Sequence, residues 1–342
     1  MKGPRWLGRS PLRLGLTISC VLLLGLIASE ALLDRWPAIA RAAQGGPLSR
    51  QDDGILRDLR IAVVHCLLAG YLPAAFLSVL RSGRETVIAL QRALDCTPKE
   101  CDALANSVRL SATGLAVAAL VGITLAFAAP YIVPPVPVSP WRPLSWAPEV
   151  AWTRILGLWL GACGAMLAYA IASVSRRMSR LATDLKSIDL FDLEPLLPFT
   201  RQGLRNALLL IGFVAISGLM LLTETGFGLL GTVVGTSTLV IAGLALLLPL
   251  RGVHRRITEA KEVELAWVNS KLREQRDVLK KGSARTSGDL SDLSAYRELI
   301  RGVRDWPIST SSYVRFAAYL LIPLISWAAA GLVERLVDAL VF

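Results

Sequence analysis

Charged residues are scarce in this 342-residue chain: they make up 18% of it, against roughly 25% in a soluble domain. So few charges cannot cover a water-facing surface, and the 54% of hydrophobic residues lie in long blocks rather than at scattered core positions. Blocks of about 20 residues match the roughly 30 Å hydrocarbon core of a bilayer. The short alternating segments of an outer-membrane barrel are missing. The sequence therefore predicts an all-α, polytopic membrane protein.

Histidine is nearly absent, with two residues, and cysteine occurs five times. A metal site needs several ligands close together, and the chain does not group them. Nothing in the sequence places His65 or His254 near a nucleophile. No predicted span carries the buried acid or base that a proton-coupled carrier needs. We therefore expect no catalytic residue, no metal and no cofactor, and we do not expect an enzyme.

Seven apolar blocks are long enough to cross a bilayer. They are residues 14–33, 61–80, 110–133, 155–174, 207–222, 229–250 and 314–333. The second is the weakest, because it contains His65 and Pro73. The first follows a basic segment and could be a cleaved signal peptide, but apolar residues continue to Leu33, which favours a retained anchor. Residues 1–250 are thus expected to form a membrane domain, and residues 313–342 the last span with an outer C-terminus.

Lysine and arginine are distributed unevenly among the connections between spans. With the N-terminus inside, the cytoplasmic segments hold 29 of the 37 basic residues and the outer segments hold 8. Such a bias predicts a multi-pass protein of the cell inner membrane, with a cytoplasmic N-terminus and a periplasmic or extracellular C-terminus. It also explains the net charge of +11 without nucleic acid, because these charges face the anionic head groups of the lipid bilayer.

Residues 251–312 are the only sizeable soluble piece. Their first half lacks proline and is rich in strong helix formers, so the sequence predicts a helix of roughly 30 residues that continues the sixth span. A flexible GSARTSG turn and a second helix over residues 289–305 follow. Together they form a cytoplasmic antiparallel helical hairpin between the last two spans. Having little core of its own, the hairpin is expected to pack on the apolar loop 176–205, on another subunit or on a partner protein.

Two cysteines, Cys96 and Cys101, flank the sequence TPKE. Thr97 as N-cap, Pro98 at the first helical position and Glu100 three residues after the cap predict a capping box that starts a helix. The cysteines then occupy the two positions of a hydrophobic staple, and thiols stay reduced in the cytoplasm. We therefore expect reduced cysteines in apolar contact, in preference to a disulfide or to half of a metal site.

Polar residues in or near spans are the candidates for function. His65 lies just inside the second span, and Glu224 lies in the turn between the fifth and sixth. The GFGLLG stretch in the same turn matches a dinucleotide-binding pattern, but it follows a membrane helix and fails the structural context of that function. Two patterns of small residues predict close helix packing. They are Gly157 with Gly161, and Gly231 with Gly235.

These features favour a membrane scaffold or sensor whose cytoplasmic hairpin contacts a protein partner or a second copy of the chain. The alternative is an oligomeric channel or transporter for an ion or small solute. Breaks in the spans would support that alternative, and the candidate breaks are Pro73 and the glycine-rich turn at residues 226–231.

Overall fold

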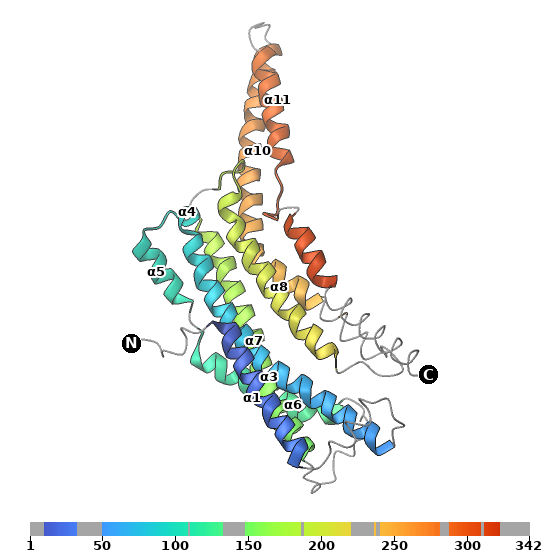
Figure 1. Cartoon of the computed structure of the whole chain (residues 1–342). Coiled ribbons are helices and arrows are strands. Elements are labelled where there is room, and N and C mark those ends of the chain that lie inside the picture. The colour runs from blue at the N-terminus through green and yellow to red at the C-terminus, as the bar shows by residue number, and fades with distance from the viewer. Residues whose placement is uncertain are drawn as a thin grey trace.

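A computed structural model describes residues 10–32, 50–108, 110–132, 148–185, 188–219, 236, 240–280, 287–308 and 311–321. Every regular element within those ranges is a helix, which confirms the all-α prediction (Figure 1). The α-helices are α1 (Pro11–Leu32), α3 (Arg50–Ala89), α4 (Gln91–Leu94), α5 (Pro98–Ser107), α6 (Ala112–Ile132), α7 (Pro148–Leu181), α8 (Leu197–Gly218), α10 (Arg251–Lys280) and α11 (Ser287–Gly302). Short 3-10 helices are η2 (Ala182–Asp184), η3 (Glu194–Leu196) and η4 (Leu248–Leu250).

Four stretches of the described residues are long and apolar enough to cross a membrane. They are Pro11–Leu32, Leu59–Ala89, Pro98–Ala128, which runs from α5 into α6, and Arg154–Asp184. These stretches contain most of the first four predicted spans and fit a membrane protein. The predicted spans 207–222, 229–250 and 314–333 extend outside the described residues, so the total of seven stays a prediction.

Some helices are longer than the spans predicted within them. α3 runs for 40 residues with Pro73 inside it, so Pro73, one of the two candidate breaks, does not break the helix. α8 begins at Leu197, well before the predicted start at residue 207, because the η3 turn leads into it and Pro198 occupies its first turn. The predicted loop 176–205 therefore shortens to the segment between α7 and α8.

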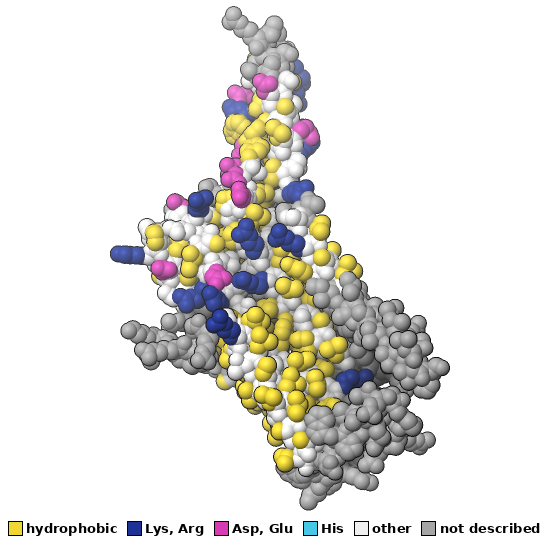
Figure 2. Space-filling view, viewed as in Figure 1, with side chains coloured by type: hydrophobic (Ala, Val, Ile, Leu, Met, Phe, Trp, Pro, Cys, Tyr) yellow, Lys and Arg dark blue, Asp and Glu magenta, His cyan; other side chains and the backbone are white. Residues whose placement is uncertain are grey.

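α7 is central to the bundle: α3 and α6 both pack against it, while α1 and α8 pack on α3 (Figure 1). The main core lies where α3, α7, α8 and the start of α10 meet, and Met178, Phe199 and Ile257 are fully buried in it. Large apolar side chains on α1 and α6 are instead exposed, among them Leu24 and Phe127. Figure 2 shows hydrophobic side chains over the body of the bundle, as expected of surfaces that face lipid.

Facing glycines allow α6 to approach α7 closely, and α1 to approach α3. On α6 and α7, a Cβ at Gly122 would clash with the carbonyl of Gly161, and a Cβ at Gly161 would lie 2.7 Å from the Cβ of Ala126. On α1 and α3, Gly15 and Gly70 face each other in the same way. Small residues allow transmembrane backbones to come this close.

The two glycines of the predicted pair on α7 have different surroundings. Gly161 lies at the crossing with α6, whereas a Cβ at Gly157 would meet no atom within 4 Å. Only one of the two therefore lies at a close helix contact within the described part of the chain. Gly231 and Gly235, the other predicted pair, lie outside the described residues.

Replacing Gly161 by alanine is expected to destabilise the protein by about 1–3 kcal/mol, because the added methyl group forces α6 and α7 apart. The matched control is Gly157→Ala on the same helix, which adds the same methyl group in open space. Thermal unfolding of both variants in detergent measures the difference. Equal melting temperatures for the two variants would contradict the described crossing.

Candidate functional site

The first three turns of α8 lie at the end of the bundle from which α10 and α11 project (Figure 1), and they carry polar side chains into the core. Gln202 is 1% exposed and Asn206 is fully buried. They are four residues apart and so lie on the same face of the helix. The sequence pattern placed Gln202 in the loop 176–205 and Asn206 between that loop and the span that starts at residue 207, and sequence reasoning missed both residues.

Four buried side chains form a continuous run of hydrogen bonds, here called the buried polar chain. The Thr86 hydroxyl of α3 donates to Oε1 of Gln202 over 3.1 Å. Nε2 of Gln202 donates to Oδ1 of Asn206 over 2.9 Å, and Nδ2 of Asn206 donates to Oγ of Ser175 on α7 over 3.1 Å. A buried polar group without a partner costs about 1–3 kcal/mol, so the chain fixes how α3, α7 and α8 align.

The base of the α10–α11 pair is tied to the same end of the bundle. The buried Thr200 hydroxyl of α8 donates to the carbonyl of Pro307, just after α11, over 2.6 Å. Nη2 of Arg256 on α10 donates to the carbonyl of Leu185 over 2.6 Å. Lys261 donates to the carboxylate of Asp305 over 2.9 Å. These bonds connect the start of α10 and the end of α11 to α7 and α8.

Beside the buried polar chain lies a pocket of about 300 Å³. Its lining residues are Glu85, Thr86, Ala89, Pro198, Arg201, Gln202 and Arg205. Glu85 accepts hydrogen bonds from Arg81 over 2.9 Å and from Arg205 over 3.3 Å. Arg201 makes no hydrogen bond or ion pair with any residue that the structure describes. The pocket lining thus combines two arginines, one carboxylate and the polar side chains of Thr86 and Gln202.

Aromatic side chains gather where the segment between α7 and α8 meets the α10–α11 pair. The Tyr296 ring of α11 lies 6.0 Å from Phe191 and 6.5 Å from Trp267 of α10, the latter edge to face. We call these three residues the aromatic face. Phe191 is 60% exposed and Trp267 is 49% exposed.

Carboxylates stand beside the aromatic face. The Tyr296 hydroxyl donates to Glu264 over 2.9 Å, and this bond, together with the nearby charge of Asp189, raises the pKa of the phenol. Apolar residues on either side of Phe191, Leu190 and Leu193, pack against the core that includes Ile257. The expected packing of this segment on residues 251–312 is therefore confirmed.

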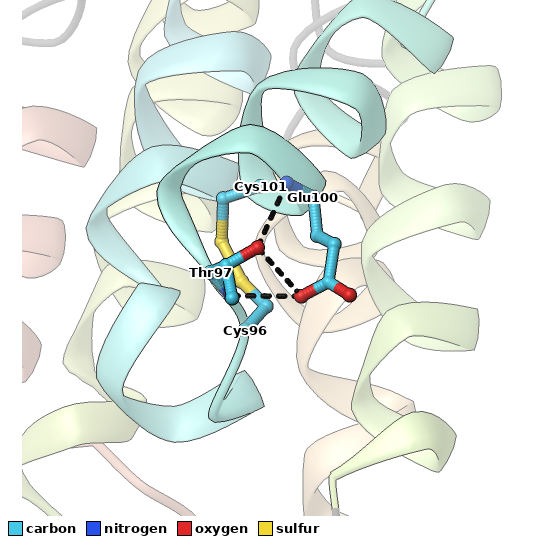
Figure 3. The surroundings of a disulfide bond; sticks show 4 residues. All are labelled: Cys96, Thr97, Glu100 and Cys101. Atoms are coloured by element: carbon cyan, nitrogen blue, oxygen red, sulfur yellow. Dashed lines mark hydrogen bonds between the residues drawn. A yellow bond between two sulfur atoms is a disulfide. The ribbon is translucent and has the colours of Figure 1, made fainter.

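The capping box at the start of α5 is present as predicted (Figure 3). The Thr97 hydroxyl accepts from the backbone N–H of Glu100 over 3.4 Å, and the Thr97 N–H donates to the Glu100 carboxylate over 2.8 Å. The expectation of reduced thiols is wrong in this structure, because a disulfide joins Cys96 to Cys101. Staple positions face each other across the cap, and that arrangement also brings the two sulfur atoms within bonding reach.

Of the two polar residues singled out from the sequence, the structure describes His65, which is not part of this site. His65 is half-buried on α3, and its Nδ1 lies 2.8 Å from the carbonyl of Ile61 in the preceding turn, so its contact is local. Glu224 lies outside the described residues. No group of three or more His, Cys, Asp or Glu that could hold a metal occurs in the described ranges.

One buried acid was overlooked. Glu30 on α1 is 3% exposed, and its Oε2 has no hydrogen-bond partner among the described residues. The expectation that no span carries a buried acid is therefore wrong for the span 14–33. Glu30 lies near the end of that span, where an acidic side chain would ordinarily reach the head groups.

No protein-family model, curated protein or solved structure matches this chain. The class of the protein therefore rests on its own helices. It is a helical protein with several apolar helices compatible with a membrane.

Replacing Asn206 by leucine is expected to lower the free energy of unfolding by about 1–3 kcal/mol, because Gln202 and Ser175 lose their buried partner. Asn106→Leu is the matched control, since Asn106 is exposed and bonds only to the exposed Arg84 among the described residues. Chemical denaturation of both variants in detergent gives the comparison. A loss no larger for Asn206→Leu than for Asn106→Leu would argue against the buried polar chain.

The purified, denatured protein is expected to show three free thiols before reduction and five afterwards. Cys20, Cys66 and Cys163 carry the free thiols, while Cys96 and Cys101 are bonded. Mass spectrometry after alkylation counts the labelled residues. Five labelled cysteines before reduction would show that the Cys96–Cys101 bond is absent.

Proposed function

We propose that the protein is a multi-pass scaffold or sensor of the cell inner membrane, whose α10–α11 helical hairpin contacts a protein partner. The observation that carries this proposal is the aromatic face, two of whose residues, Trp267 and Tyr296, lie on a helix pair that projects away from the bundle (Figure 1). Phe191 and Trp267 remain exposed although both contact Tyr296.

Large aromatic side chains favour a protein partner over water. Tyrosine and tryptophan are enriched at protein interfaces, where they bury much area and lose little side-chain entropy. Val263 on α10 and Leu299 on α11 are further large apolar residues that remain exposed on the pair. Asp189 and Glu264 supply negative charge beside the aromatic face. A partner surface with apolar and basic side chains would complement this arrangement.

The proposed orientation places the projecting end in the cytoplasm. α5, the segment between α7 and α8, and the α10–α11 pair lie toward the same end of the bundle (Figure 1). The basic bias of the sequence supports this placement, with 29 of 37 lysines and arginines in the segments assigned to that side.

The disulfide favours the opposite orientation, because such bonds are rare in the cytoplasm. The capping box keeps Cys96 close to Cys101 whether or not the bond forms, so the pair responds to its surroundings rather than fixing them. The proposed orientation therefore follows the charge bias. Labelling of an introduced Ser283→Cys by a membrane-impermeant thiol reagent should occur only after cells are opened. Labelling of that position in intact cells would reverse the orientation.

Transport of an ion or solute is the second candidate function. It is favoured by the buried carboxylate of Glu30, because ionisable groups within a span are costly and commonly functional. Solute or ion flux into liposomes that contain the purified protein tests it. Flux that is lost in Glu30→Gln or Glu224→Gln would replace the scaffold proposal.

The double variant Phe191→Ser and Trp267→Ser is expected to lose most of the protein that co-purifies with the wild-type chain. Removing two interface aromatics costs about 2 kcal/mol or more each, which is at least a thirtyfold loss of affinity per residue. Val278→Ser, farther along α10, is the matched control and should retain the partner. Affinity purification from solubilised membranes with quantitative mass spectrometry provides the measurement. If the partner also survives replacement of residues 259–304 by a short linker, the hairpin does not bind it.

A further inference from the structure

The arginine-lined pocket lies where the bundle changes from apolar to charged. Arg201 and Arg205 are one turn apart on α8, and the helix becomes strongly apolar directly after them, from Ala207 onward. On the other wall, Glu85 lies near the end of the apolar stretch that finishes at Ala89, and its partner Arg81 lies one turn earlier on the same helix. Figure 2 shows lysine and arginine side chains in the zone between the hydrophobic body and the projecting helix pair. This is the depth at which lipid head groups meet a membrane protein.

The pocket is built for an anion. The single carboxylate of Glu85 is outnumbered by three nearby arginines, Arg81, Arg201 and Arg205. The cluster therefore carries excess positive charge. A guanidinium group binds phosphate oxygens in a two-pronged manner, and Arg201 has no competing partner among the described residues.

The backbone adds to this preference, and it is independent of the arginines. α8 begins at the pocket with Pro198 in its first turn and directly continues the η3 turn. The N-terminal end of α8, which carries the positive end of the helix dipole, therefore lies beside the pocket. Gln202 and Thr86 place an amide and a hydroxyl in the pocket lining, and both belong to the buried polar chain.

We infer that this pocket binds a phosphate group, supplied by an anionic phospholipid or by a free phosphate anion. Arg201 and Arg205 are the ligand-binding residues. Glu85 holds Arg205 when the pocket is empty and competes with the phosphate. Both side chains of the Glu85–Arg205 pair are half-exposed, so the pair is weak and Arg205 can exchange partners at small cost. This inference is independent of the proposed partner contact.

The test is a lipid titration of the full-length protein in detergent, followed by native mass spectrometry. Arg201→Gln combined with Arg205→Gln is expected to weaken binding of phosphatidylglycerol by on the order of thirtyfold, since each arginine near a head group contributes about 1 kcal/mol. Arg273→Gln combined with Arg276→Gln removes the same charge from exposed positions on α10 and should leave the affinity unchanged. Phosphatidylcholine, which has no net charge, should bind the wild type and both double variants alike.

Glu85→Gln is expected to bind phosphatidylglycerol more tightly, and a misfolded protein would not show such an increase in affinity. Removing the competing carboxylate is expected to strengthen binding of phosphatidylglycerol by about two- to fivefold. Inorganic phosphate added at millimolar concentration identifies the source: displacement of the lipid assigns the site to phosphate of either origin, and lack of displacement assigns it to the phospholipid. Equal losses in the two arginine double variants, or weaker binding in Glu85→Gln, would overturn the inference.

Discussion

The alignment of α3, α7 and α8 depends on one run of hydrogen bonds among buried side chains. Inside the core, hydrogen bonds link Thr86, Gln202, Asn206 and Ser175 in a row. Removing any one of these side chains leaves a buried neighbour without its hydrogen-bond partner. Their position is as important as their chemistry. The first three turns of α8 also hold Thr200 against Pro307 and direct Arg201 and Arg205 to the pocket. The polar end of the bundle is therefore one connected structure rather than a set of loops.

The apolar part of the bundle is held together by different means. Lipid tails are as apolar as leucine, so burial of apolar surface gives helices little reason to associate within the hydrocarbon region. There the helices gain contact by close backbone approach, at Gly15 against Gly70 and at Gly122 against Gly161. Hydrogen bonds then take over at the polar end, where water competes for them and burial of Gln202 and Asn206 removes that competition. Close backbone packing is thus the effective interaction in the apolar part of the bundle, and buried hydrogen bonds are the effective interaction at its polar end.

Local sequence patterns were enough to predict the all-helical class, the first four apolar stretches, the length of α10 and the cap at Thr97, because each depends on residues close together in the chain. The start of α8 was not predictable in this way. Gln202 and Asn206 look like loop residues until their partners on α3 and α7 are known, and those partners are distant in sequence. The disulfide was misjudged because a staple and a disulfide require the same proximity of Cys96 and Cys101. Glu30 was overlooked because its burial depends on the helices around it.

The attachment of α10 has a mechanical consequence. Its hydrogen bonds to Leu185 and to the segment after α11 come from about its first three turns, while its 30 residues extend over about 45 Å. A rigid rod held at one end magnifies small rotations. A tilt of about 5° at the base displaces the far end by about 4 Å, which is comparable to one helical turn. Small rearrangements among the helices of the bundle are thus converted into large displacements at the tip, without any change in the rod itself.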